Sequence, residues 1–224
     1  MTSIIFFKFN NNLWWAFTQM GLHRNYLESI EGQQFYKMLG TGSGPGFSMY
    51  PDFYTYALLQ VWEDLSYFKK FYQSNKYLDT YLSKSNQYRV IMLSNIRSSG
   101  YWDGINPFEN KKSKKLNNVT KKIAVLTRGT INFSKLIYFW SSIKQSSDAI
   151  SSAKGVSFFK GVGELPLIQQ ATFSIWDSEE SINSFAYKNI NHKEIINRTR
   201  RQNWYKEDLF ARFHILEDSG FKQI

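Results

Sequence analysis

Hydrophobic residues along this chain follow two different rhythms, and each change of rhythm marks the boundary of an expected element. Short apolar runs rich in aromatic and β-branched residues are typical of strands, whereas apolar residues three or four positions apart are typical of helices. In the first part of the chain the expected strands are residues 3–9, 35–39, 54–62 and 87–96, and the expected helices are residues 13–29 and 65–82. The order is strand, helix, strand, strand, helix, strand.

The same order returns in the second part of the chain. There the expected strands are residues 123–128, 156–162, 171–176 and 209–216, and the expected helices are residues 133–153 and 179–201. A β-α-β-β-α-β order is that of a ferredoxin-like unit. We therefore predict an α+β protein with one ferredoxin-like repeat at 1–97, a linker at 98–120 and a second repeat at 121–224.

Each four-stranded sheet of such a protein would have one face covered by helices and one bare face that must be buried. The two sheets can bury these faces by pairing face to face or edge to edge. In either case the expected product is a dimeric α/β barrel made from a single chain.

The two halves also match residue by residue. The aligned pairs, each 114 positions apart, are Ala57 with Ala171, Trp62 with Trp176, and Phe71 with Phe185. The same offset aligns Leu78 with His192. One half therefore keeps an ordinary core leucine where the other has a side chain that can bind a metal.

His192 lies on the apolar face of the last expected helix. Phe185 precedes it by seven positions and Ile196 follows it by four, so its imidazole points toward the core. A core histidine hydrogen-bonded to a backbone carbonyl would explain this position as well as a metal ligand would. The other two histidines, His23 and His214, are too scattered for a multi-histidine metal site.

Composition narrows the possible chemistry. The chain has no cysteine, which excludes disulfides, thiolate ligation of haem and iron–sulfur clusters held by this chain. Lysine and arginine (28) outnumber aspartate and glutamate (18), and six of the lysines lie within residues 111–122. The positive charge is therefore largely a property of the expected linker, although a basic surface could also favour an anionic membrane.

The amino-terminal apolar run is too short for a secretory signal, and no stretch of about 18 apolar residues is present for a membrane-spanning helix. We therefore expect a cytoplasmic protein, with peripheral contact to a membrane left open.

Several segments of the chain together carry a family pattern. In the second half these are residues 127–131, 160–166, 170–176, 185–186, 192 and 203–213, and in the first half residues 39–42, 46–47, 51–52 and 62–64. This pattern resembles the spheroidene monooxygenase family, the haem-containing carotenoid oxygenases. The resemblance covers most of the chain and is strongest after Thr127.

The resemblance implies a monooxygenase that uses haem b and O2, with electrons from a separate donor such as a ferredoxin. Its substrate would be an apolar polyene, an acyclic carotenoid, oxidised to a hydroxy or keto product. His192 would be the axial ligand of the iron, which leaves the far face open for dioxygen.

Haem propionates favour cations at the rim of their pocket. The candidates are Arg128, Arg198, Arg200 and Arg212, with Arg128 the first choice. Each could equally be a surface charge or form an ion pair with Glu207, Asp208 or Glu164. Glu164, in the Gly-Glu-Leu-Pro segment, is the candidate catalytic residue, because it could relay protons to bound oxygen; it could also simply cap the turn.

Other functions remain open from the sequence. A haem barrel enzyme of different chemistry, aldoxime-dehydratase-like or haem-degrading, would share the fold, as would a barrel oxygenase without a cofactor. An RNA-binding ferredoxin-like protein would also combine a sheet, positive charge and aromatic residues. Nucleic acid is nevertheless not the expected partner, because Val156 stands where the first stacking aromatic residue should be.

Overall fold

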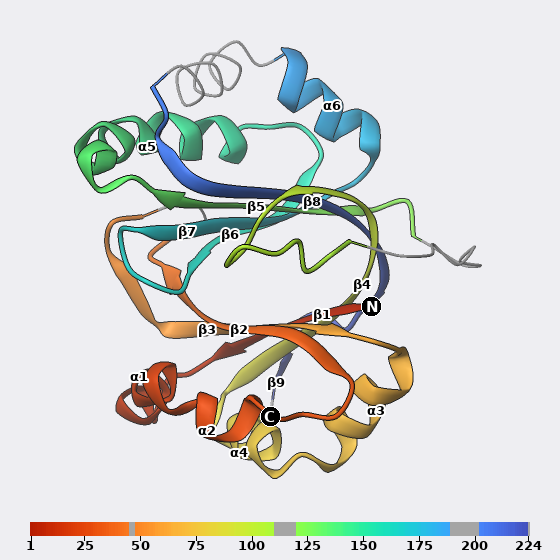
Figure 1. Ribbon diagram of the computed structural model, residues 1–224. Coiled ribbons are helices and arrows are strands. Elements are labelled where there is room, and N and C mark those ends of the chain that lie inside the picture. Colours follow the sequence, from red (N-terminus) through yellow and green to blue (C-terminus); the bar gives the residue numbers. More distant parts are fainter. Residues whose placement is uncertain (45–47, 110–119, 189–201, 224) are drawn as a thin grey trace.

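The computed structural model describes residues 1–44, 48–109, 120–188 and 202–223, and it has two four-stranded antiparallel sheets with helices on their outer sides (Figure 1). The elements of the first half are β1 (Thr2–Lys8), α1 (Leu13–Leu22), α2 (Arg24–Leu27), β2 (Gln33–Gly42), β3 (Pro51–Trp62), α3 (Leu65–Ser74), α4 (Lys76–Lys84) and β4 (Gln87–Gly100). Those of the second half are β5 (Ile123–Ile131), η1 (Phe133–Lys135), α5 (Leu136–Ser151), β6 (Val156–Gly163), β7 (Gln169–Trp176), α6 (Glu179–Lys188), β8 (Tyr205–Asp218) and β9 (Lys222–Gln223).

All predicted strands overlap observed ones, but two predicted helices are interrupted. The helix predicted at 65–82 is two helices, because Asn75 has an extended backbone and its side-chain oxygen accepts a hydrogen bond from the Leu78 amide (2.9 Å). Asn75 is therefore the N-cap of α4, a role that asparagine favours. The helix predicted at 13–29 is likewise divided into α1 and α2. Of the helix predicted at 179–201, only α6 lies within the described residues.

The two sheets join edge to edge and close into an eight-stranded antiparallel barrel. Strand order is β4-β1-β3-β2 in the first sheet and β6-β7-β5-β8 in the second, and the seams are β2–β6 and β4–β8. The β4–β8 seam is long, running from Ile91 opposite Asp218 to Gly100 opposite Leu209, whereas β2 and β6 share only two register pairs. This arrangement confirms the predicted α+β barrel and selects the edge-to-edge alternative.

The β4–β8 seam ends at a position that requires glycine. Gly100 has a φ of +90°, and a Cβ atom built there would lie 2.1 Å from the carbonyl oxygen of Asp208. Any side chain would therefore force the two strands apart.

The barrel interior is filled by one large apolar cluster to which both sheets contribute alternate residues. Phe6 and Leu59 represent the first sheet, Phe173 and Phe213 the second. Because successive side chains of a strand point to opposite faces, this cluster fixes which residues of every strand face inward.

The segment that follows β4 also belongs to the interior. Trp102 and Phe108 are almost completely buried in the interior cluster, and Figure 1 shows this segment passing between the two sheets. These residues fall in the predicted linker at 98–120, of which residues 110–119 lie outside the described part. The start of that stretch is thus a structural part of the barrel, which its lack of periodicity did not indicate.

The outer faces of the two sheets are packed differently. Helices α1 to α4 cover the first sheet through a single cluster of buried residues, among them Ile5, Met38 and Leu58. On the second sheet, α5 and α6 pack through two smaller and separate clusters, one around Trp176 and one around Trp204. Within the described residues, no helix combines the length and apolarity needed to cross a membrane.

Candidate functional site

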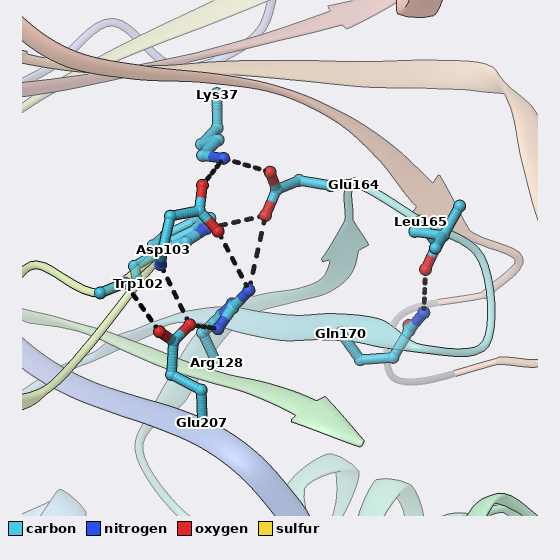
Figure 2. A network of polar contacts seen from close by, with 9 residues as sticks. Lys37, Trp102, Asp103, Arg128, Glu164, Leu165, Gln170 and Glu207 are labelled. Atoms are coloured by element: carbon cyan, nitrogen blue, oxygen red, sulfur yellow. Dashed lines mark hydrogen bonds and ion pairs between the residues drawn. The ribbon is translucent and has the colours of Figure 1, made fainter. Parts of the chain in front are cut away.

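A network of charged side chains and one tryptophan connects strands of the two sheets beside the barrel interior (Figure 2). It consists of Lys37 from β2, Trp102 and Asp103 after β4, Arg128 from β5, Glu164 after β6 and Glu207 from β8. Two cations thus face three carboxylates, in a part of the barrel that lies next to the apolar interior cluster. We call this group the interior charge cluster.

Arg128 is the centre of the interior charge cluster and is only 2% exposed. Its Nη1 donates to Glu207, and its Nη2 lies 3.9 Å from Glu164 Oε1 and 3.8 Å from Asp103 Oδ1. Its guanidinium also lies over the Trp102 ring, 5.4 Å from the ring centroid. Of the roles predicted for Arg128, the structure therefore shows the ion pair with carboxylates, which a buried guanidinium needs as partners.

Both carboxylate oxygens of Glu164 are engaged. Oε1 accepts a hydrogen bond from the Trp102 indole nitrogen (2.7 Å), and Oε2 is paired with the ammonium of Lys37. Glu164 therefore connects β2 to the segment after β4. The predicted proton relay would have to act from within these contacts.

Glu207 is held by backbone as well as by Arg128. The amides of Asp103 and Gly104 donate to its two oxygens at 3.0 and 2.8 Å. Burial raises the pKa of this carboxyl, but the two amides and the Arg128 guanidinium outweigh burial, and the pKa lies below its ordinary value. Glu207 is thus ionised at neutral pH and anchors the turn that carries Trp102.

Arg212, another predicted haem-binding residue, lies on the opposite face of the second sheet. Its neighbours Ala211 and Phe213 point into the barrel, so Arg212 points toward α6. There its Nη1 lies 3.0 Å from Glu179 and its Nη2 lies 3.2 Å from Asn183. Arg128 and Arg212 are therefore separated by the sheet and cannot both touch one flat cofactor.

His192, Arg198 and Arg200 lie outside the described residues. Of the remaining histidines, His23 ends α1 with its Nδ1 3.1 Å from the Gln19 carbonyl oxygen. His214 lies on the outer face of β8, and its Nδ1 is buried without a hydrogen-bond partner among the described residues. In the part of the chain that the structure describes, no three histidine, cysteine or acidic side chains come together as a metal site.

The outer face of the second sheet carries a row of small side chains. Following the strand register across β6, β7 and β5, this row consists of Gly161, Thr172 and Thr127. The next residue in register, Phe210 of β8, is large and packs with the cluster around Trp176. The corresponding row of the first sheet, across β2, β3, β1 and β4, consists of Met38, Leu58, Ile5 and Val90. We call the row in the second sheet the small-residue row.

Two further observations distinguish this row from ordinary packing. The Thr172 hydroxyl is buried and has no hydrogen-bond partner among the described residues, and Thr127 is exposed although its sheet is flanked by helices. Next to the row, Gly129 packs against Tyr205, whose ring would lie 2.7 Å from a Cβ atom at position 129. The row lies between the two apolar clusters of the outer face.

Comparison with known proteins places these features in a family. No family model matches the chain. A spheroidene monooxygenase of Cereibacter sphaeroides is 34% identical over 217 residues, which are 96% of this chain and 66% of that protein. The chain belongs to the spheroidene monooxygenase family.

Two more members of the spheroidene monooxygenase family support this assignment. The protein of Rhodobacter capsulatus is 28% identical over 222 residues, 98% of this chain and 92% of its own length. That of Rubrivivax gelatinosus is 28% identical over 189 residues, 84% of this chain and 71% of its own length. The match extends through both halves of the barrel.

Solved structures of proteins outside the spheroidene monooxygenase family have a similar fold. An aldoxime dehydratase in complex with butyraldoxime has a TM-score of 0.56 at 11% identity, covering 96% of this chain and 79% of that one. A second aldoxime dehydratase has a TM-score of 0.55 at 12% identity, covering 100% and 84%. At such identities the likeness concerns the fold alone.

The sequence alone predicted part of this geometry. It gave Arg128 and Glu164 as candidates and Glu207 and Glu164 as possible ion-pair partners of the arginines, and the structure confirms both pairings for Arg128. It missed Lys37 and Asp103, which come from the first half and the segment that follows it. It also missed the small-residue row. The signal was present in the 114-residue offset, which aligns Leu58 with Thr172.

Proposed function

We propose that this chain is a monooxygenase that inserts oxygen from O2 into an apolar polyene, an acyclic carotenoid, to give a hydroxy or keto product. The observation that carries the proposal is the 34% identity to a spheroidene monooxygenase along 96% of the chain. Electrons would come from a separate donor protein, such as a ferredoxin.

We propose haem b as the cofactor, bound at the outer face of the second sheet. The small-residue row supports this position, because a flat ring system needs room between sheet and helices. In the first sheet, bulky Met38, Leu58 and Ile5 fill the corresponding place. The buried Thr172 hydroxyl offers a polar group toward that space.

His192 would hold the iron. Among the predicted propionate partners, Arg212 lies on the outer face of the second sheet, where we propose the haem. When bound, a haem with one imidazole ligand supplies dioxygen activation with electrons from the donor. The part of the chain's own residues would be to exclude water and orient the polyene. Arg198 and Arg200 remain predicted propionate partners.

Glu164 remains a predicted proton relay, but it faces the barrel interior rather than the small-residue row. Its contacts with Lys37 and Trp102 support a positioning role for the segment after β4. A proton relay through Glu164 would have to pass from the interior charge cluster, around the end of β6, to the proposed cofactor on the outer face of the second sheet.

We infer that the two halves are two copies of a ferredoxin-like unit. The repeated element order and the matched strand orders β4-β1-β3-β2 and β8-β5-β7-β6 support this. Since only the second copy has the small-residue row and His192, this repeat would give one cofactor site per chain.

We also propose peripheral contact with a membrane, where a carotenoid would be dissolved. Three aromatic side chains are exposed side by side: Trp14 (77%) and Phe17 (45%) of α1 and Phe53 (46%) of β3. The ring centroid of Phe17 lies 5.8 Å from that of Trp14 and 5.7 Å from that of Phe53. Exposed aromatic rings favour the interfacial layer of a membrane. Trp14→Ala should reduce co-sedimentation with lipid vesicles several-fold, whereas unchanged sedimentation would contradict this contact.

The central experiment compares the wild type with His192→Ala after expression with ample haem. The wild type should show a Soret band and convert an acyclic carotenoid when given a reducing donor. His192→Ala should lose or shift that band and lose conversion. A wild type that takes up no haem, or an unchanged spectrum of the variant, would contradict the assigned cofactor or ligand; conversion without haem would leave the family activity standing.

A further inference from the structure

The weak seam of the barrel has an opening that the proposed oxygenase site does not use. Strand β6 pairs with β2 only at Val162 and Gly163, so the edge of β6 over residues 156–160 has no strand partner among the described residues. A cavity of about 430 Å³ lies there. Its size is within the range of about 300 to 1,000 Å³ that is usual for small-molecule sites.

The inner wall of this seam cavity is aromatic. Phe6 and Phe158 line it, and their ring centroids are 5.4 Å apart. Both rings also lie near Phe173, at 5.8 and 6.4 Å, so the wall continues into the apolar interior of the barrel. Phe221, near the carboxyl end, forms part of the rim.

Lys8 and Lys160 line the seam cavity and Arg89 packs against its Phe158 and Phe221 rings; two of these three cations have carboxylate partners. Lys160 Nζ lies 3.0 Å from Asp52, and Arg89 donates to both oxygens of Asp218 at 2.9 and 2.6 Å. The Arg89 guanidinium also packs on Phe158, 4.6 Å from its ring centroid. These pairs are neutral overall and hold the rim of the cavity in place.

Lys8 is the exception among the three. It lines the cavity with its Nζ 4.0 Å above the Phe221 ring, and no carboxylate of the described residues lies within 4 Å of it. Among the described residues, Lys8 is therefore a positive charge without a carboxylate partner beside an aromatic wall. A half-buried ammonium in such a place favours an anionic partner.

We propose that the seam cavity is a binding site for an amphipathic monocarboxylate of fatty-acid type. Its carboxylate would pair with Lys8, and its apolar chain would lie along Phe6 and Phe158. The cavity is lined by the first residues of β6, whereas Glu164 of the interior charge cluster follows the last, and no residue of that cluster or of the small-residue row lines it. It therefore stands independently of the proposed cofactor and activity.

Calorimetric titration of the full chain with decanoate tests this site. The wild type should bind decanoate saturably at one site, and at least about tenfold more tightly than decanol, which lacks the charge. Lys8→Met, which keeps the apolar stem, should weaken decanoate binding about tenfold and leave decanol binding unchanged. Lys8→Arg should largely restore decanoate binding because it keeps the charge.

Lys69→Met is the matched control, since it removes one lysine charge from the exposed side of α3. It should leave decanoate binding as in the wild type. The proposal is overturned if folded wild type shows no saturable binding, if decanol binds as tightly as decanoate, or if Lys69→Met weakens binding as much as Lys8→Met. The comparison of decanoate with decanol on the wild type tests the proposal even if a variant fails to fold.

Discussion

Single residues in this protein gain their roles from partners that are distant in sequence. Arg128 is an unremarkable position in a strand until Glu207, 79 positions later, and Asp103 are brought beside it. Burying a guanidinium is costly unless its charge is matched, and the three carboxylates of the interior charge cluster meet that requirement. The same contacts fix the turn that carries Trp102 in the barrel.

Glu207 gives a pH-dependent test at this scale. Its pKa in the folded protein lies below the ordinary value of 4.5, so the ionised carboxylate stabilises the fold above that pH. This stabilisation is lost as the pH falls through the folded-state pKa. Glu207→Gln should therefore lower the free energy of unfolding by about 1 to 2 kcal/mol at pH 7, and the difference should shrink below pH 4.5.

Urea unfolding of the two proteins between pH 7 and pH 3 measures this difference. Glu31→Gln, at the exposed pair between Glu31 and Lys70, serves as the control and should change stability little at any pH. A Glu207→Gln effect that stays constant down to pH 3 would contradict the assigned role of the ionised carboxylate.

At the scale of elements, the two sheets share a pattern but differ in the size of the side chains on their outer faces. The first sheet presents Met38, Leu58 and Ile5 to its helices and packs as one cluster. The second presents Gly161, Thr172 and Thr127 in the same register positions and packs as two clusters. The two sheets thus have the same strand order but differ in side-chain bulk at this row.

Restoring that bulk tests the proposed cofactor position. Thr172→Leu introduces the residue that the first half has at position 58, and it removes a buried hydroxyl that lacks a hydrogen-bond partner among the described residues. The variant should be at least as stable as the wild type, because apolar burial replaces an unsatisfied polar group. Its haem uptake should fall about tenfold or more.

The absorbance of haem per chain and the thermal midpoint are the two readouts. Thr80→Leu makes the same change on the exposed side of α4 and should leave haem uptake unaltered. Full haem uptake by a stable Thr172→Leu would place the cofactor elsewhere in the molecule.

At the scale of the whole molecule, both halves depend on one interior. The apolar cluster inside the barrel draws Phe6 and Leu59 from one sheet and Phe173 and Phe213 from the other. Each sheet alone would expose its inner face to water, and large apolar surfaces of that kind drive association. The long β4–β8 seam adds backbone hydrogen bonds between the halves.

We therefore expect that the segments 1–97 and 121–224 do not fold as monomers when produced separately. Size-exclusion chromatography should show each as associated or unfolded, while co-expression should recover a folded complex. A monomeric, cooperatively unfolding 1–97 fragment would contradict this dependence and would make the first repeat an independent domain.

The sequence by itself determined the order of strands and helices, because hydrophobic periodicity and turn residues act locally. It also determined the barrel class, since two sheets with one bare face each must bury those faces together. Arg128 and Glu164 could be named from short segments, and the 114-residue offset paired Trp62 with Trp176 and Leu78 with His192.

Only the tertiary structure decided which edges join, that Asp103 lies beside Arg128, and that Arg128 and Arg212 lie on opposite faces of one sheet. The break at Asn75 and the burial of Trp102 and Phe108 were also decided there. The physical reason is the same in each case. Register between distant strands sets which side chains meet, and this register depends on the packing of the whole barrel rather than on any local pattern.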